Sequence, residues 1–298
     1  MPKVSIGLPV YNGDNFLKEA IDSFLNQTFR DFELIITDNA STDNTETICR
    51  QYAASDKRII YHRHNKNLGA AYNYNHGFNL AKGQYFKWAA HDDVCAPTYL
   101  EECVAILESN SDIVLCYPQT VIIDEAGEKV KFYNDDLHLP FAEPFQRFAY
   151  YQKNLRAVGE RNPIFGLIRL DALKCTPLIG SFVASDVTLL GELALHGQFY
   201  ELPSRLFFRR DHVNTSVRSN PELNKRIAWF DVKKKDKITL TRWRWFYEYL
   251  KAIFRVRMNF KNRLFCLFEM GKWFRYHIRG LLEDLTSAFA QLTWLSSK

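Results

Sequence analysis

The chain lacks the patterns that mark several protein classes. Its six cysteines are scattered, without a CxxC pair, which fits neither a zinc site nor a secreted disulfide framework. No stretch reaches the roughly 18 uninterrupted apolar residues that a membrane-spanning helix requires. Met1 to Val4 lead directly into a strand-like run, so no signal peptide is expected. We therefore expect a soluble or peripheral protein in a reducing cytoplasm.

Two glycine-rich phosphate motifs are missing as well. No GxGxxG follows the first strand-like run, which argues against a nicotinamide-dependent dehydrogenase. The segment from Pro9 to Asn15 is not the Gly-rich loop of a sugar nucleotidyltransferase. The 298 residues are 47% hydrophobic and 15% aromatic, enough to bury a sizeable core as one large domain or a domain with an appendage.

Charge is distributed unevenly along the chain. Residues 221–298 hold 17 Lys and Arg against 7 Asp and Glu, a balance of +10, whereas the whole chain carries +5. Residues 1–220 therefore carry −5. The C-terminal segment 241–294 also interleaves basic residues with aromatic ones, a composition suited to the membrane interface. An amphipathic helical hairpin that covers the rest of the chain or forms a homodimer is the alternative, and nucleic acid is not expected as a partner.

The first hundred or so residues alternate between strand and helix signals. Strands are predicted over 4–10, 32–37, 58–62 and in the apolar run before His91, and helices over 16–25, 45–54 and from 69 to about 81. Beyond them we expect helices over 99–108, 141–151 and 186–196, strands over 113–117, 120–123, 162–170 and 205–212, and further helices after residue 221. Alternating strands and helices imply right-handed crossovers and a mostly parallel α/β sheet.

Polar loops follow three of the predicted strands, after Val10, Thr37 and Ala90. Ligands of such sheets bind beyond the carboxyl ends of the strands, so Asp38, Asp92 and Asp93 are expected to line one cleft. Two adjacent carboxylates at the end of a buried strand are costly to ionise together unless a cation or strong donors hold them. Mg²⁺ or Mn²⁺ bridging a diphosphate would meet that need, and a solvated turn is the alternative.

Six segments of the chain form an ordered set of motifs. They are Pro9-Val10-Tyr11-Asn12-Gly13, Gln27-Thr28-Phe29, Thr37-Asp38-Asn39-Ala40-Ser41-Thr42-Asp43, Asn67-Leu68-Gly69, Gly83-Gln84-Tyr85 and His91-Asp92-Asp93. In this order and spacing they resemble the inverting, non-processive family 2 glycosyltransferases, which have the GT-A fold. They cover roughly residues 3–100, with weaker matches to about 216. The processive Gln-x-x-Arg-Trp signature is not present, which favours addition of a single sugar.

The resemblance implies a role for each candidate residue. The nucleotide would be held by Pro9, Tyr11, Asp14, Asp38, Asn67 and Gly69. Asp92 would bind the ribose and a metal, Asp93 and His212 would bind the metal, and the diphosphate would be bound by Arg209 and Arg210. Asp186 would be the catalytic base. Each has a structural alternative. Asp38 could cap the helix that follows it, Asp186 could stabilise a helix N-terminus, and the arginines could pair with Asp211.

The resemblance also divides the chain and suggests an activity. Residues 1–216 would form the GT-A domain, with a nucleotide-sugar half (1–100) and an acceptor half (101–216), and residues 217–298 a helical extension. The implied reaction transfers a sugar from a UDP- or dTDP-linked donor to a glycan or lipid-linked acceptor in polysaccharide or cell-surface glycan synthesis. Ala90 replaces the first acid of the usual Asp-x-Asp-Asp. This departure supports a rival interpretation, a catalytically silent sugar-nucleotide-binding or membrane-scaffolding protein of the same fold.

Overall fold

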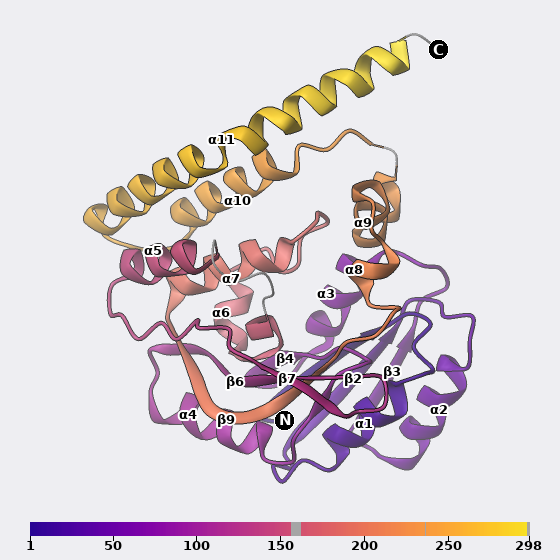
Figure 1. The fold of residues 1–298 in the computed structure, drawn as a ribbon. Helices are drawn as coiled ribbons and strands as arrows, with labels where there is room; N and C mark the ends of the chain where they lie inside the picture. The colour runs from indigo at the N-terminus through magenta and orange to yellow at the C-terminus, as the bar shows by residue number, and fades with distance from the viewer. Residues whose placement is uncertain (156–161, 236, 297–298) are drawn as a thin grey trace.

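Strands and helices alternate through the N-terminal part of the chain, as the hydrophobic pattern predicts. The computed structural model describes residues 1–155, 162–235 and 237–296. It begins with β1 (Val4–Val10), α1 (Leu17–Leu25), β2 (Phe32–Asp38), α2 (Thr45–Ser55), β3 (Ile59–Arg63), α3 (Ala70–Leu80) and β4 (Tyr85–Trp88) (Figure 1). Every residue of β1, β2 and β4 is buried. Burial on both faces of a parallel sheet explains why these strands are rich in apolar residues throughout.

The middle of the chain forms the second half of the sheet and its covering helices. The elements are β5 (Val94–Cys95), α4 (Tyr99–Ser109), β6 (Ile113–Ile123), β7 (Lys129–Tyr133), α5 (Pro144–Leu155), the 3₁₀ helix η1 (Asn162–Phe165), β8 (Leu167–Arg169), α6 (Leu170–Lys174), α7 (Ser185–His196) and β9 (Gln198–Arg210). The prediction missed the short strand β5 and the solvent-exposed strand β7.

Three predicted strands differ from the structure because of prolines. The strand expected over 162–170 is replaced by η1, the three-residue strand β8 and the first residue of α6, because Pro163 and Gly166 form a turn in which the Gly166 N–H donates to the Pro163 carbonyl. Conversely, the two strands expected on either side of Pro118 are one strand, β6. The pairing register with β9 shifts at Pro118 and Gln119, and this irregularity accommodates a residue without an N–H.

The strands of the described chain form one sheet in the order β3-β2-β1-β4-β8-β6-β9-β5, with β7 paired to β6. β1 to β4 are parallel to one another, and β6 is parallel to β9. β8 is antiparallel to both β4 and β6, so these two strands run in the same direction. The sheet is therefore mostly parallel and flanked by helices, as predicted, and its main strands end at one edge.

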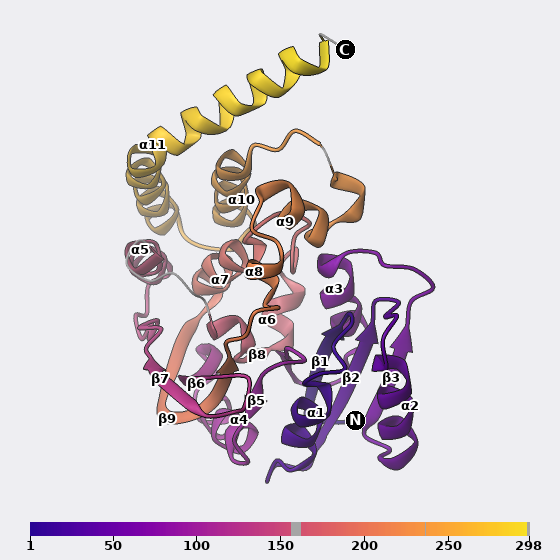
Figure 2. The same cartoon turned by 45° about the vertical axis from the view of Figure 1, so that its right-hand side comes forward.

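The C-terminal part is helical, as expected, and lies over this edge of the sheet (Figures 1 and 2). It consists of α8 (Ser216–Ser219), α9 (Leu223–Phe230), the 3₁₀ helix η2 (Val232–Lys234), α10 (Thr241–Arg255) and α11 (Phe260–Ser296). α10 packs on α7, and α11 packs on α10 and α5. Across the described residues, no helix has both the length and the apolar character needed to cross a membrane.

Candidate active site

The loops after β1, β2 and β4 meet at the carboxyl edge of the sheet, as predicted from their positions. Asn12, after β1, donates its backbone N–H to the Ser41 hydroxyl at 2.9 Å and accepts the Thr42 N–H at 2.8 Å. A Cβ on Gly13 would lie 2.5 Å from the ring of His91, so the loop after β1 also touches the loop that carries the Asp pair. Glycine is required at this position because the imidazole occupies the space of a side chain.

Asp38 lies at the end of β2 and is completely buried. One of its carboxylate oxygens accepts the Ser41 N–H at 2.8 Å. The other accepts the Tyr61 hydroxyl at 2.8 Å and lies 3.3 Å from Nε of Arg63. The sequence analysis missed both β3 partners, although the pairing of Asp38 with Arg63 in the β2–β3 register places alternate β3 side chains on its face. Asp38 is thus held by three protein donors, and a nucleobase would have to share or replace one.

The other candidate nucleotide residues surround Asp38. Pro9 is buried within β1, while Tyr11 just beyond it is 45% exposed and offers an open aromatic ring. Asp14 accepts from both the backbone and the side-chain N–H of Asn44 at 3.3 Å, which ties its loop to the start of α2. The Asn67 side chain accepts from the Asn39 amide and the Gly69 N–H, both at 2.9 Å. The structure therefore gathers these residues around the ends of β1, β2 and β3.

Gly69 is constrained by the C-terminal segment. Its φ of +90° is a conformation that favours glycine, and a Cβ there would lie 2.7 Å from the carbonyl oxygen of Phe230 at the end of α9. The ammonium group of Lys234 donates to the carbonyl and hydroxyl oxygens of Ser181 at 2.8 and 2.9 Å. The segment containing α9 and η2 therefore bridges the nucleotide loop after β3 and the loop before α7.

Asp92 and Asp93 lie between β4 and β5, where the end of β9 reaches them. The Asp92 carboxylate lies 3.0 Å from Nε2 of His212, and the Arg210 backbone N–H donates to the Asp93 carboxylate at 2.9 Å. Burial, followed by the charge of Asp92, raises the pKa of Asp93 to about 8. Burial alone would also raise the pKa of Asp92, but the His212 hydrogen bond and the nearby His91 outweigh it and lower that pKa. The surroundings of the two carboxyls therefore favour the ionised form of Asp92 and disfavour that of Asp93.

The predicted metal ligands are Asp92, Asp93 and His212. No group of three or more His, Cys, Asp or Glu side chains suited to a metal ion occurs in the part of the chain that the structure describes. One carboxylate oxygen of Asp93, Oδ1, accepts the Arg210 N–H, and the predicted role of Asp93 as a metal ligand stays a prediction. Asp92 and His212 remain as a carboxylate and imidazole pair, and the Asp92 side chain is 17% exposed. This pair fits a hard divalent cation that takes its other ligands from water and phosphate oxygens, as Mg²⁺ usually does.

Arg210 has a different place from the one predicted. Its side chain is 1% exposed, and its guanidinium donates to the carbonyl oxygens of Asp92, Asp124 and Glu125 at 2.9–3.0 Å. It also pairs with Glu19 of α1 and stacks over the Phe16 ring at 4.6 Å. Direct binding of a diphosphate by Arg210 is not supported, because these contacts engage all its nitrogens. Arg210 instead positions the Asp92–Asp93 loop.

Arg209 is the neighbouring arginine and is partly exposed. It lies close enough to Asp93 for its positive charge to lower the pKa of that carboxyl. Because β9 side chains alternate between the two faces of the sheet, Arg209 points to the opposite face from Arg210. It remains a candidate for contact with an anionic substrate group.

Asp186 lies in the first turn of α7, two residues after Ala184, which has a left-handed backbone conformation with φ of 57°. Asp186 and the Asp pair both act electrostatically on the same side chain, that of Tyr74 on α3. Burial raises the pKa of the Tyr74 phenol, and the charges of Asp92, Asp93 and Asp186 raise it further. Tyr74 therefore lies within electrostatic reach of all three carboxyl groups, and the sequence contained no motif that marked it.

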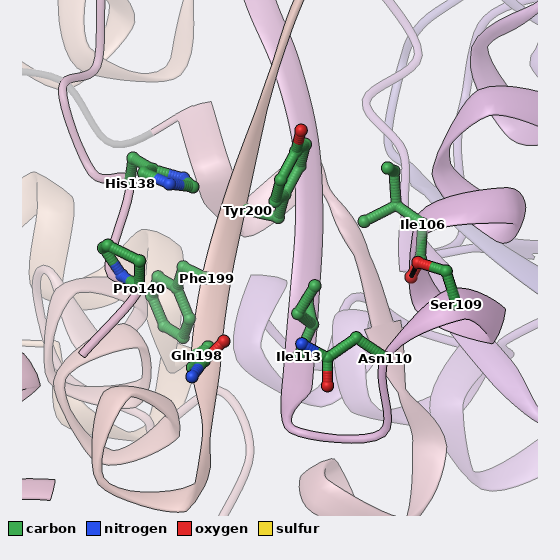
Figure 3. Close-up of a pocket in the computed structure, with 9 residues that line it drawn as sticks. All are labelled: Ile106, Ser109, Asn110, Ile113, His138, Pro140, Gln198, Phe199 and Tyr200. Atoms are coloured by element: carbon green, nitrogen blue, oxygen red, sulfur yellow. Dashed lines mark hydrogen bonds between the residues drawn. The ribbon is translucent and has the colours of Figure 1, made fainter. Parts of the chain in front are cut away.

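A cavity elsewhere in the molecule does not belong to this site. A pocket of about 340 Å³ lies between the end of α4 and the first residues of β6 and β9, with Ile113, His138, Gln198 and Tyr200 in its wall (Figure 3). The Asp pair contacts the last residues of β9, at the other end of that strand. The pocket is thus separated from the candidate site by the length of β9.

Comparison with known proteins gives a consistent picture. A family model described as Glycosyl transferase family 2 matches residues 5–176. An uncharacterized glycosyltransferase of Rickettsia typhi is 34% identical over 203 residues, which cover 67% of this chain and 57% of that protein. The chain therefore spans little more than half the length of this curated relative.

Two solved structures have a similar fold. The S. aureus protein TarS, residues 1–349, in complex with UDP-GlcNAc has a TM-score of 0.55 at 17% identity over 86% of this chain and 82% of that one. The mannosyltransferase PcManGT from Pyrobaculum calidifontis, in complex with GDP-Man and Mn²⁺, has the same TM-score at 14% identity over 99% of this chain and 79% of that one. At these identities the likeness concerns the fold alone, and it supports the GT-A architecture.

Proposed function

Because the chain belongs to glycosyl transferase family 2, we propose that it moves a single sugar from a nucleoside-diphosphate sugar to a hydroxyl group, with inversion at the transferred carbon. The donor would be UDP- or dTDP-linked, and the acceptor a glycan or a lipid-linked glycan in polysaccharide or cell-surface glycan synthesis. One observation carries the proposal: the loops after β1, β2, β3 and β4 converge beside the Asp92–His212 pair.

The donor nucleotide would bind at the ends of β1 and β2. Tyr11 supplies an exposed aromatic face for the base, and Asp38 supplies a buried acceptor that fits a pyrimidine imide N–H. The hydrogen bonds of Asp38 with Tyr61 and Ser41 hold the carboxylate in place before the ligand arrives. The backbone around Asn67 and Gly69 would support the nucleotide from the β3 side.

Asp92, Asp93 and His212 would hold Mn²⁺ or Mg²⁺ together with the donor diphosphate, and PcManGT is described in complex with Mn²⁺. When bound, such an ion acts as a Lewis acid that neutralises the departing diphosphate. Arg210 fixes the backbone of Asp92, and the Arg210 N–H holds Asp93 beneath it. Arg209 would add a positive charge near the phosphate groups.

Asp186 would act as the general base on the acceptor side. In the transfer, the acceptor oxygen forms a bond to the anomeric carbon as the bond from that carbon to the diphosphate breaks. The acceptor hydroxyl proton passes to Asp186. Tyr74 lies within electrostatic reach of Asp186 and of the Asp pair, which supports a common site for these carboxyl groups.

The test combines donor binding with sugar transfer. A panel of nucleotide sugars is screened for thermal stabilisation with Mn²⁺, because a bound ligand raises apparent stability by mass action. Transfer by the donor that binds is then measured with acceptor extracts, with metal and with a chelator. Asp92→Asn and Asp186→Asn are expected to lower transfer at least 100-fold. The matched control is Asp171→Asn on α6, whose carboxylate is 95% exposed.

Each outcome decides between the two interpretations of this fold. Donor binding with metal-dependent transfer that Asp186→Asn abolishes supports the enzyme. Donor binding without transfer to any acceptor would favour the silent sugar-nucleotide-binding protein for which Ala90 argues. Transfer that persists in the chelator and in Asp92→Asn would refute the metal role.

A further inference from the structure

The two C-terminal helices carry a concentration of exposed apolar side chains. In the described chain, 19 large apolar side chains are exposed, and 10 of them lie on α10 and α11. On α11 the exposed fraction reaches 78% at Phe260, 60% at Phe268 and 67% at Phe289. Scattered exposed apolar residues are ordinary on proteins, but a contiguous group on one element indicates a contact surface.

Six of these side chains form one stripe along α11. They are Phe260, Leu264, Phe268, Ile278, Leu282 and Phe289, and at about 100° per residue they fall within roughly 80° around the helix axis. The opposite side of the helix packs on the protein through Cys266, Met270, Trp273 and Leu281, all at most 1% exposed. We call the exposed stripe, together with the basic residues between its members, the outer face of α11.

Exposed basic residues lie within the outer face. They are Lys261, Lys272, Arg275 and Arg279. Lys272 also contacts Glu269 on the same helix at 2.6 Å. The larger segment 221–298 has a balance of +10, as the sequence shows. An apolar stripe with cations beside it is the pattern of a helix that lies flat in the interface of an anionic bilayer.

We propose that the outer face of α11 binds the surface of an anionic lipid bilayer, with the helix lying parallel to the membrane plane. The phenylalanine and leucine side chains enter the boundary between headgroups and acyl chains, and the arginine and lysine side chains pair with lipid phosphates. Charge favours this occupant over a second copy of the chain. A symmetric dimer through this face would place like charges from the two copies, including Arg275 and Arg279, in one interface.

The outer face of α11 lies on the same side of the molecule as the strand ends of the candidate site (Figures 1 and 2). α9 and the ends of β1 and β2 lie on the side of the molecule that also carries α10 and α11 (Figures 1 and 2). A bilayer bound to the outer face therefore lies near the side where the strands end. The membrane proposal does not depend on the proposed reaction, since binding can be measured without any sugar donor.

Vesicle co-sedimentation of the full chain tests the proposal. The probes are phosphatidylcholine vesicles, alone or with 30 mol% phosphatidylglycerol. Binding is expected only to the anionic vesicles and should weaken from 0.1 M to 0.5 M salt, because ions screen exposed charges. Equal binding to both vesicle types, or no binding to either, would overturn the proposal.

Variants separate the outer face from other exposed residues. Each cation near an anionic surface contributes about fivefold to binding, so Arg275→Gln with Arg279→Gln should weaken partitioning about 25-fold. The triple change Phe260→Ser, Phe268→Ser, Phe289→Ser should also release the protein. Phe132→Ser on β7 is the control, since this phenylalanine is 61% exposed but lies outside the outer face.

Two further measurements test whether the variants remain folded and whether the chain forms dimers. Thermal unfolding of each variant should match that of the unchanged protein, since the substituted side chains are exposed. Sedimentation velocity without lipid reports the oligomeric state. A dimer that the phenylalanine substitutions dissociate, with no vesicle binding, would show that the outer face is an interface between copies and would overturn the membrane proposal.

Discussion

Replacing Arg210 with methionine tests whether this buried arginine positions the Asp92–Asp93 loop. Methionine keeps the apolar stem over Phe16 but removes the guanidinium, which donates to three carbonyl oxygens and pairs with Glu19. Removing one partner from a buried, hydrogen-bonded charge typically costs 3–5 kcal/mol, and each orphaned acceptor 1–3 kcal/mol. Glu19 is half exposed and can be hydrated again, which limits the loss. We expect the free energy of unfolding to fall by about 3–5 kcal/mol.

Urea unfolding followed by tryptophan fluorescence measures this change, and sugar transfer at a temperature where the variant is folded measures the effect on the site. Arg209→Met is the matched control for the stability measurement alone, because Arg209 is the partly exposed neighbour on the same strand, and its replacement should cost less than about 1 kcal/mol. The reasoning is refuted if Arg210→Met leaves stability unchanged while abolishing donor binding, since the guanidinium would then act on the ligand itself.

Three further changes have defined outcomes. Gly69→Ala should lower the free energy of unfolding, measured in urea, by about 1–3 kcal/mol, because Gly69 has a positive φ and lies close to the Phe230 carbonyl. An unchanged urea midpoint would mean that the end of α9 does not pack against Gly69. Arg255→Met should cost roughly 3 kcal/mol in the same assay by leaving the Glu192 carboxylate, 4% exposed, without its partner. Burial raises the pKa of Asp135 from 3.8 to about 7, so the folded state binds the proton more tightly than the unfolded state does. The free energy of unfolding should therefore fall as the pH rises from about 4 to about 7, by up to roughly 4 kcal/mol. Unfolding curves across this range should show a smaller decline in Asp135→Asn, and an identical decline would contradict the assignment.

The elements of the sheet could be predicted where hydrophobic runs were long and uninterrupted. β1, β2 and β4 are buried along their full length, so their continuous apolar sequences predict strands. Their parallel arrangement follows from the helices between them. β5 has two residues and β7 is largely exposed, so neither produces a periodic signal. The prediction of two strands on either side of Pro118 was wrong because a register shift in the β6–β9 pairing accommodates this proline. The sequence of a single strand does not reveal such a shift.

The candidate site could be located from the sequence more readily than its side chains could be assigned. Strand ends identified Asp38, Asp92 and Asp93, but their partners come from distant segments. Asp92 contacts His212, 120 residues away. The contacts of Arg210 could not be foreseen either, because the sequence gave no sign that Glu19 of α1 and three backbone carbonyls enclose its guanidinium. Tyr74 was missed because its importance depends on where α3 packs.

The order of strands in the sheet has a consequence for synthesis of the chain. β9, from residues 198–210, pairs on one side with β6 and on the other with β5, so the last strand to emerge from the ribosome is an interior one. Until it emerges, the buried apolar strand β6 presents an unsatisfied edge, and such edges recruit other chains. Nascent chains stalled before residue 198 should therefore be the species that chaperones bind and that aggregates.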